Sequence, residues 1–431
     1  MRFIGQTEIQ ERLNPSMNSD LQIMPRLRPI EPVELAVQGR RVIGLKDPLQ
    51  LSDNVLCFHH EALPLLAMLD GRHSLLDIQA HLTARTGRIV FLDEIKGLLE
   101  KLDESFLLEG DRFRKAFEQK TAAYRQNPFR PSSHAGKSYS DDPEKLKGEL
   151  GSHFEAEMGG PGHPELFSDS RRPVGIVAPH IDIRAGGKSF AHAYHALASG
   201  QPSDIYVILG TGHAGVEKMF TACSLDFQTP LGIVQTDRDL LDLLSSEIGR
   251  DAAQEEILHA TEHVIEFQLV FLQYIFSNRH QFTILPILCS LSYNIFGKDE
   301  SFAAQREVFK QFCAAVKKIC RKSSKSVCFV ASADLDHIGP QYGDSFVPHQ
   351  GTVARAIEKD GELMGSLERL DINDFISRVA IDSDARRICG FSPITAMFHC
   401  MEASEAKLLS LDHAYVDDRN SFVSFASMIF H

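Results

Sequence analysis

Three short apolar runs, each followed by a histidine, constrain the fold of this chain most. The pairs are 174–178 with His180, 205–209 with His213, and 327–331 with His337. A short run rich in β-branched residues and bounded by small residues is typical of a buried strand in a largely parallel sheet. Because ligands bind beyond the carboxyl ends of such strands, we expect the three imidazoles to converge at one edge of a sheet.

Strand-like and helix-like segments alternate from residue 173 onward. The expected strands are 174–178, 205–209, 282–288 and 326–331. The expected helices between and after them are 188–198, 237–248, 263–276 and 301–320. This alternation predicts a three-layer α/β domain over 131–431, with a largely parallel or mixed sheet between two layers of helices.

A separate small α+β domain is expected over 29–112, after a flexible leader (1–28) and before a linker helix (113–130). Its expected elements are strands 34–39 and 40–45 around a Gln-Gly turn, helices 61–69, 74–86 and 93–103, and a closing strand 105–109. This order resembles winged-helix modules of the PqqD-like type, which recognise peptides beside peptide-modifying enzymes. A packing or regulatory domain without a ligand is the alternative.

Composition and charge exclude several classes of protein. The formal net charge of the 431 residues is −13, and an acidic surface repels the phosphates of nucleic acids. No run of about 18 apolar residues is present, and the first residues lack the apolar core of a signal peptide. The eight cysteines include no C-x-x-C pair, which is typical of reduced thiols. We therefore expect a cytoplasmic protein that binds neither nucleic acid nor membrane.

Six short motifs within 127–431 occur in the order and spacing of the MEMO family. They are Ser133–Tyr139, Ala178–His180, Ile208–His213, Glu262–Glu266, Ser332–Gly339 and Ile388–Gly390. The chain thus resembles a family that is related in fold to the LigB-type class III extradiol dioxygenases. The family also includes the B component of the AmmeMemoRadiSam system.

The resemblance implies a metal site. Two histidines and a cysteine of the family are associated with iron or copper, and they correspond here to His180, His213 and Cys389. Asp334 and His337 match the pair that completes the family's pocket. This chain departs from the family just after His180, where residues 181–183 read Ile-Asp-Ile in place of the usual Ala-Gly-Tyr, which puts substrate contacts of that loop in doubt.

The residue types are consistent with metal chemistry. Two imidazoles and one thiolate leave open coordination positions, and a thiolate shifts preference toward Cu(I) or zinc while still permitting Fe(II). His337 is a candidate general acid–base because imidazole titrates near neutral pH. Asp334 is a candidate either to orient His337 or to form a hydrogen bond with a metal ligand. Pro393 suggests that a helix begins after Cys389, whose thiol pKa the helix dipole would then lower.

Other polar residues allow more than one interpretation. His263 and Glu266, three apart on a predicted helix, are either ligands or a proton-transfer pair, or else a structural ion pair. His134 and Tyr139 either line the pocket or seal it. Residues 210–215 also match the dinucleotide-binding pattern G-x-G-x-x-G, but the segment that follows looks like a strand rather than the required helix.

Two functions are compatible with these features. The first is a non-haem Fe- or Cu-dependent redox enzyme, dioxygenase-like and acting on a small molecule in a radical-SAM-associated modification system. The second is a non-catalytic component of such a system that binds a peptide or a radical-SAM protein. Hydrolysis by a serine triad is disfavoured because no G-x-S-x-G motif is present.

Overall fold

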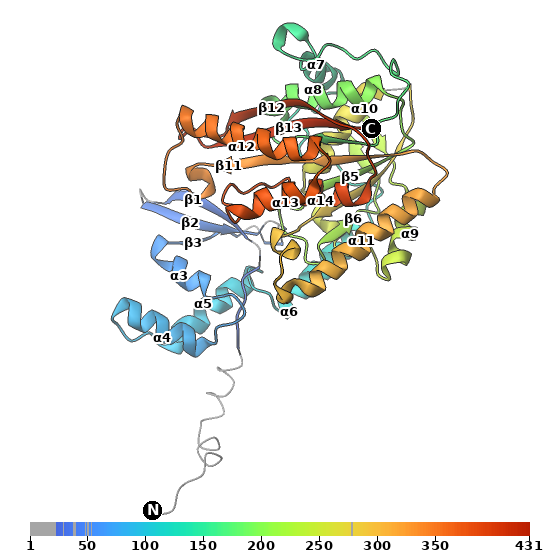
Figure 1. The fold of residues 1–431 in the computed structure, drawn as a ribbon. Coiled ribbons are helices and arrows are strands. Elements are labelled where there is room, and N and C mark those ends of the chain that lie inside the picture. The colour runs from blue at the N-terminus through green and yellow to red at the C-terminus, as the bar shows by residue number, and fades with distance from the viewer. Residues whose placement is uncertain are drawn as a thin grey trace, which may run out of the picture. The chain divides into compact units, whose positions relative to one another are not determined.

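The chain divides into two compact units. The computed structural model describes residues 23–431 except 29, 38–39, 48, 50, 53 and 277–278. The first unit ends at Ala123 and the second comprises Tyr124–His431 (Figure 1). Most of the expected leader, 1–22, lies outside the described residues. Residues 26 and 27 form bridges with Asp70 and Leu108, so ordered structure begins before residue 29.

The first unit contains a three-stranded antiparallel sheet followed by helices. Its elements are β1 (Glu31–Val37), β2 (Arg40–Lys46), β3 (Leu56–Phe58), α3 (Leu63–Ala67), α4 (Leu75–Thr86), α5 (Leu92–Glu104) and α6 (Asp111–Tyr124). The turn expected at 38–39 lies outside the described residues. Ser74 and Asp77 form a capping box that begins α4, as their spacing predicts.

The closing strand expected over 105–109 is absent. Ser105 caps α5, and Phe106 has a φ of +58°, which is incompatible with an extended strand. Leu108 forms only a single bridge, with Leu27, while Leu107 is buried in the core of this unit. The expected linker helix also differs, because α6 ends at Tyr124 and residues 125–130 are not helical.

The second unit is built on an eight-stranded mixed sheet, which confirms the three-layer α/β prediction. Its strands run in the order β11-β13-β4-β10-β5-β9-β6, and β12 pairs with β13. β4, β10, β5 and β9 are mutually parallel, whereas β6, β11, β12 and β13 pair antiparallel. The strands are β4 (Gly175–Ala178), β5 (Ile205–Thr211), β6 (Phe220–Ala222), β9 (Thr283–Cys289), β10 (Val327–Ser332), β11 (Asp334–Ile338), β12 (Ala406–Tyr415) and β13 (Phe422–Phe430). A separate hairpin joins β7 (Phe227–Thr229) to β8 (Gly232–Val234).

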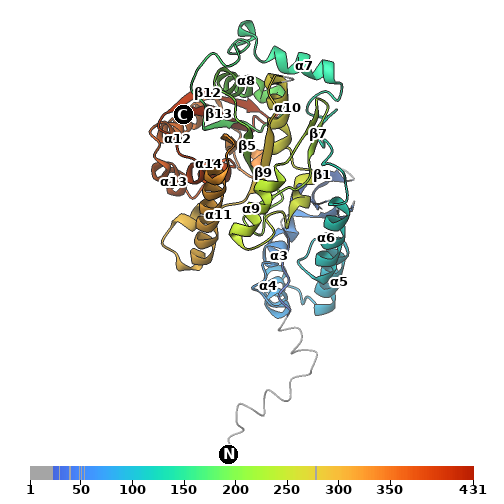
Figure 2. The ribbon, with the colours of Figure 1, turned by 90° about the vertical axis from the view of Figure 1, so that its right-hand side faces the viewer.

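Helices cover both faces of this sheet (Figure 2). One face packs against α8 (Ile183–Ser199) and α10 (Val264–Phe276), whose Phe190 and Phe271 rings stack 4.8 Å apart. The other face packs against α9 (Arg238–Ile248), α11 (Ala303–Lys322), α12 (Gln350–Glu368), α13 (Ile372–Ile381) and α14 (Phe391–Cys400) in one continuous apolar cluster. α7 (Pro143–Ser152) precedes this layered body. In the described part of the chain, no helix combines the length and apolar character needed to cross a bilayer.

The parallel strands bring polar residues to one edge of the sheet. His180 follows β4, His213 follows β5, and Asp334 begins β11 directly after β10. β10 lies between β4 and β5, so these three loops are neighbours. The buried apolar strands therefore deliver the chemically active side chains to a common position.

Candidate metal centre

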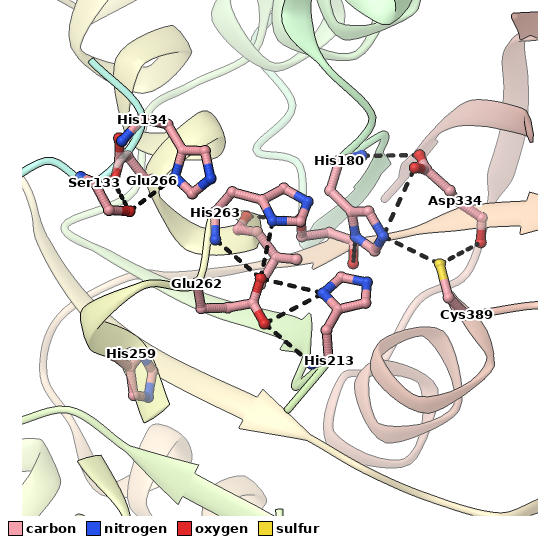
Figure 3. Close-up of polar contacts among 12 residues, drawn as sticks. Ser133, His134, His180, His213, His259, Glu262, His263, Glu266, Asp334 and Cys389 are labelled. Atoms are coloured by element: carbon pink, nitrogen blue, oxygen red, sulfur yellow. Dashed lines mark hydrogen bonds and ion pairs between the residues drawn. The ribbon is translucent and has the colours of Figure 1, made fainter. Parts of the chain in front are cut away.

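His180, His213 and Cys389 lie together at the carboxyl edge of the sheet (Figure 3). The two imidazole centroids are 5.2 Å apart, and His180 Nε2 lies 3.1 Å from Cys389 Sγ. One nitrogen of each histidine and the sulfur all lie within 4.8 Å of one another. Residues separated by more than 200 positions in the sequence thus form a single cluster of donor atoms.

His180 is buried and held in one orientation. Its backbone N–H donates to Asp334 Oδ1 (2.9 Å), and its Nδ1 donates to the carbonyl oxygen of Ser332 (3.0 Å). Burial, followed by the charges of His213 and His263, lowers the pKa of His180 well below its ordinary value. The ring is therefore neutral at pH 7, with an unprotonated Nε2 directed at Cys389.

His213 has a carboxylate partner and access to solvent. Its backbone N–H and its Nδ1 both donate to Glu262, at 3.0 Å to Oε2 and 3.1 Å to Oε1. Burial opposes protonation of the ring, but the charge and hydrogen bond of Glu262, together with the charge of Asp334, outweigh burial and raise the pKa of His213. The side chain is 42% exposed, so a ligand bound at this position has a path to solvent.

The third imidazole of the cluster is His263 rather than His337. The His263 ring stacks on His213 at 5.1 Å and lies 5.6 Å from His180. Its Nδ1 lies 3.0 Å from Glu262 Oε1. Glu262 lies within one of the six motifs, where the sequence alone assigns it no role. The available signal was a carboxylate adjacent to His263 just before a predicted helix.

Glu266 does not pair with His263, which corrects the expected ligand or proton-transfer pair. Its carboxylate forms a buried ion pair with Arg130 and accepts hydrogen bonds from the backbone of Ser133 and His134, each at 2.9 Å. The carboxylate therefore ties the segment 130–139 to α10. The two residues sit one turn apart, but each side chain has a different partner.

His134 and Tyr139 differ in their relation to the cluster. The His134 ring lies 5.4 Å from His263 and 5.6 Å from Phe267, so it borders the cluster. Burial lowers the pKa of His134 to about 4. Tyr139 is buried, and its hydroxyl donates to Glu266, so it seals the segment instead of facing the cluster.

Asp334 has the second of its two expected contacts, because its carboxylate accepts a hydrogen bond from the backbone of the candidate ligand His180. Burial raises the pKa of Asp334 to about 6, although hydrogen bonds from the backbone of His180 and Ile181 oppose this rise. His337 bonds through Nδ1 to the carbonyl of Leu335 (3.0 Å), and its ring lies edge-on to Tyr342. Burial lowers the pKa of His337 to about 4, so the expectation that it titrates near neutral pH is wrong.

Cys389 precedes α14, as Pro393 predicts, but its thiol is not activated in the metal-free chain. Burial, and next the charge of Asp334, raises the pKa of Cys389 well above the ordinary thiol value. The helix dipole was expected to lower this pKa, and desolvation of the buried thiolate outweighs it. A bound cation would reverse this balance, because coordination stabilises the thiolate.

The dinucleotide interpretation of residues 210–215 is wrong. β5 ends at Thr211, and the chain passes through turns to the strand β6 without forming a helix. A pyrophosphate site of this type requires a helix N-terminus at the glycine-rich turn. The loop instead positions His213.

Comparison with known proteins decides the family. A family model described as Memo-like protein matches residues 130–429. The chain belongs to the Memo-like family. This confirms the recognition based on the six short motifs, and the second unit is hereafter called the Memo-like unit.

Two relatives show how the units combine. A MEMO1 family protein of Aquifex aeolicus is 26% identical over 390 residues, covering 90% of this chain and 95% of the relative. Another, from Methanosarcina barkeri, is 30% identical over 306 residues, covering 70% of this chain and 99% of the relative. An alignment of 390 residues is longer than the stretch from residue 130 onward. The similarity to the Aquifex protein therefore extends into the first unit, whereas the archaeal protein corresponds in length to the Memo-like unit.

The donor set of the Memo-like unit fits a transition metal ion. His180 Nδ1 and His213 Nδ1 both donate to oxygen acceptors, which leaves each Nε2 lone pair free for coordination. The sulfur of Cys389 supplies the third donor. His213, Glu262 and His263 form a second close group, but the Glu262 oxygens already accept hydrogen bonds from both histidines.

Proposed function

We propose that the Memo-like unit binds one transition metal ion, Fe(II) or copper, through His180 Nε2, His213 Nε2 and Cys389 Sγ. The observation that carries this proposal is the convergence of Cys389 Sγ and one nitrogen of each histidine within 4.8 Å. Zinc is compatible with the same ligands. We further propose a redox or oxygen-handling reaction as the activity.

The surroundings of the three donors support a reactive rather than a closed site. A bound ion with three protein ligands supplies open coordination positions for a substrate or O₂. His213 is 42% exposed and His263 is 27% exposed, so solvent reaches the side of the cluster that these rings form. A closed structural site would surround its ion with four protein ligands.

Residues around the donors have separable tasks in this proposal. Asp334 and Ser332 hold His180 in place, and Glu262 holds His213. His263 places a third imidazole beside the open side of the cluster. His337 is neutral at pH 7 and would donate or accept a hydrogen bond rather than act as a charged acid.

The second candidate function is a non-catalytic binding component of a modification system. The observation that favours it is the separate first unit, whose similarity to the Aquifex protein shows that the combination is shared. A peptide or a radical-SAM protein would be the partner under this proposal. The metal site would then organise the Memo-like unit without turnover.

Metal analysis of the purified protein tests the first proposal. We expect about one equivalent of iron or copper after anaerobic reconstitution and loss of at least ~90% of it in His180→Ala. The matched control is His192→Ala, which removes an imidazole from α8 away from the cluster. Unchanged metal content in His180→Ala would refute the assigned ligand.

Turnover separates the two candidate functions. The metal-loaded protein is incubated with a catechol panel and O₂, and ring-cleavage products and oxygen consumption are recorded. Turnover that His180→Ala loses and His192→Ala retains supports the enzyme. Metal binding without turnover on any substrate favours the binding component.

A further inference from the structure

Glu262 contacts both solvent-accessible imidazoles of the cluster. This residue is 8% exposed and lies between the short 3-10 helix Glu256–Ala260 and α10. Oε1 accepts from the backbone N–H of His263 (2.9 Å) and lies 3.0 Å from His263 Nδ1. Oε2 accepts from the backbone N–H of His213 (3.0 Å), and both oxygens lie within 3.2 Å of His213 Nδ1 (Figure 3).

A carboxylate facing two ring nitrogens determines where the protons of those rings lie. An ionised carboxylate only accepts hydrogen bonds, so each Nδ1 that contacts it must carry the hydrogen. A neutral imidazole with a proton on Nδ1 has an unprotonated Nε2. Glu262 therefore imposes the same tautomer on His213 and His263.

The backbone of Glu262 is fixed by a buried arginine. Arg130 Nη2 donates to the carbonyl oxygen of Glu262 (2.6 Å), and Arg130 Nε donates to the carbonyl oxygen of His259 (2.9 Å). The guanidinium is fully buried and paired with Glu266. The backbone that carries Glu262 thus cannot shift toward or away from the rings without losing a hydrogen bond from this buried guanidinium.

We propose that Glu262 is a positioning residue that fixes two imidazoles in the Nδ1–H tautomer. His213 is thereby restricted to binding the metal through Nε2. His263 is left with an unprotonated Nε2 beside the metal ligands, where it accepts a hydrogen bond from an N–H or O–H group of the substrate. The metal-binding half of this inference rests on the proposed function, whereas the tautomer half does not.

Glu255 offers a matched control for loop anchoring. Its carboxylate accepts from the backbone N–H groups of Glu217 and Lys218, at 3.2 and 3.0 Å, and so ties down the same loop that carries His213. These two bonds involve no imidazole. A purely structural role of Glu262 would make Glu262→Gln and Glu255→Gln similar in effect.

The test uses the full chain labelled with ¹⁵N-histidine. In the metal-free wild type, at a pH high enough for both rings to be neutral, long-range ¹H–¹⁵N spectra are expected to show His213 and His263 with a protonated Nδ1 and an unprotonated Nε2. Four N–H groups of His213 and His263 face the Glu262 carboxylate, and Glu262→Gln keeps one acceptor oxygen, with two lone pairs, and places an NH₂ donor where the other oxygen was. We expect at least one ring to change tautomer and metal affinity to fall by about 10–100-fold. Glu255→Gln should keep both tautomers and change the affinity by less than about threefold.

Each outcome bears on one of the two proposals. Either ring in the neutral Nε2–H tautomer in the metal-free wild type would overturn the inference, and this measurement needs no variant to fold. Unchanged tautomers and affinity in folded Glu262→Gln would overturn it too, as would an equal loss in Glu255→Gln. The expected tautomers in a wild type that binds no metal support the role of Glu262 and refute the proposed metal site.

Discussion

At the scale of single residues, metal binding at the candidate site depends on which nitrogen and sulfur atoms are protonated. The Nδ1–H group of His180 donates a hydrogen bond to a backbone carbonyl, and that of His213 donates one to a carboxylate, so in each neutral ring Nε2 carries no proton. Cys389 differs, because burial favours the neutral thiol until a cation is present. In the metal-free protein His180 is therefore a neutral nitrogen donor, His213 donates through Nε2 once its ring is neutral, and Cys389 donates only after its thiol loses a proton.

The raised pKa of Cys389 predicts slow alkylation of the metal-free protein. Only the thiolate reacts, so the iodoacetamide rate at Cys389 should be low at pH 7–8 and still be rising above pH 9. Peptide mass spectrometry follows the rate, with exposed Cys57 as the internal reference. Half-maximal reactivity near or below neutral pH would show that the helix dipole prevails over burial.

At the scale of elements, the position of Cys389 is fixed by the packing of Gly390 and by the hydrogen bonds of Arg386. Gly390 begins α14 beside the link from β10 to β11, and a Cβ at this position would lie 2.4 Å from the carbonyl oxygen of Asp334. The loop before it is anchored by Arg386, which donates to Asp336 (2.7 Å) and Asp360 (2.8 Å) in the interior. The sulfur is thus positioned by packing on one side and by a buried ionic network on the other.

Replacing Gly390 by alanine should displace Cys389. The added methyl group overlaps backbone atoms that cannot yield, so we expect a loss of about 1–3 kcal/mol in stability and at least a ~10-fold loss in metal affinity. The control is Gly361→Ala within α12, where the nearest atom is 3.9 Å away. That change should stabilise the unit by roughly 0.4–1 kcal/mol. Thermal melts measure the change in stability of both variants, and metal titrations measure the change in affinity. Equal metal affinities in the two variants would contradict the prediction.

The Asp336 carboxyl predicts a dependence of stability on pH. Burial, and next the charge of Asp360, raises the pKa of Asp336 above its ordinary value. The folded protein then keeps a proton that the unfolded chain loses above about pH 4, so stability falls as pH rises from there through the folded-state pKa. Asp336→Asn imitates the protonated acid and should remove this slope, raising Tm at pH 8 but not at pH 4. Each kcal/mol regained corresponds to roughly 2–4 °C. Parallel pH profiles for the two proteins would contradict the assignment.

At the scale of the whole molecule, the sequence predicts the strands of the Memo-like unit better than it predicts the last element of the small first unit. The parallel strands β4, β5, β9 and β10 follow from their apolar runs, since each is buried on both faces. The strand expected at 105–109 fails because a local positive φ at Phe106 is invisible to hydrophobic patterning. The periodicity of apolar residues predicts which side chains are buried, but it does not predict the φ angle of a single residue.

The candidate site also has features that the sequence predicts and features that it does not. His180, His213 and Cys389 could be named from short motifs, because those motifs mark positions in the chain. The short motifs do not show that His263 rather than His337 is the third imidazole, because this depends on how two loops pack in space. The pKa of Cys389 was misjudged for the same reason, since burial is a tertiary property.

The Memo-like unit should bind metal without the first unit. All three candidate ligands lie in residues 124–431, and the Methanosarcina relative is matched over 99% of its length by only 70% of this chain. We expect a fragment of residues 124–431 to bind one equivalent of metal with an affinity within about threefold of the full chain. Calorimetric titration of both proteins measures this. A folded fragment that binds no metal would mean that the first unit contributes to the site.

The most direct test of the central claim is X-ray absorption spectroscopy of the protein loaded with one equivalent of zinc, a redox-inert stand-in. The account predicts one sulfur at about 2.3 Å and at least two imidazole nitrogens at about 2.0–2.1 Å, with the sulfur lost in Cys389→Ser. A coordination sphere of nitrogen and oxygen alone in the wild type would contradict the convergence of His180, His213 and Cys389 on one ion.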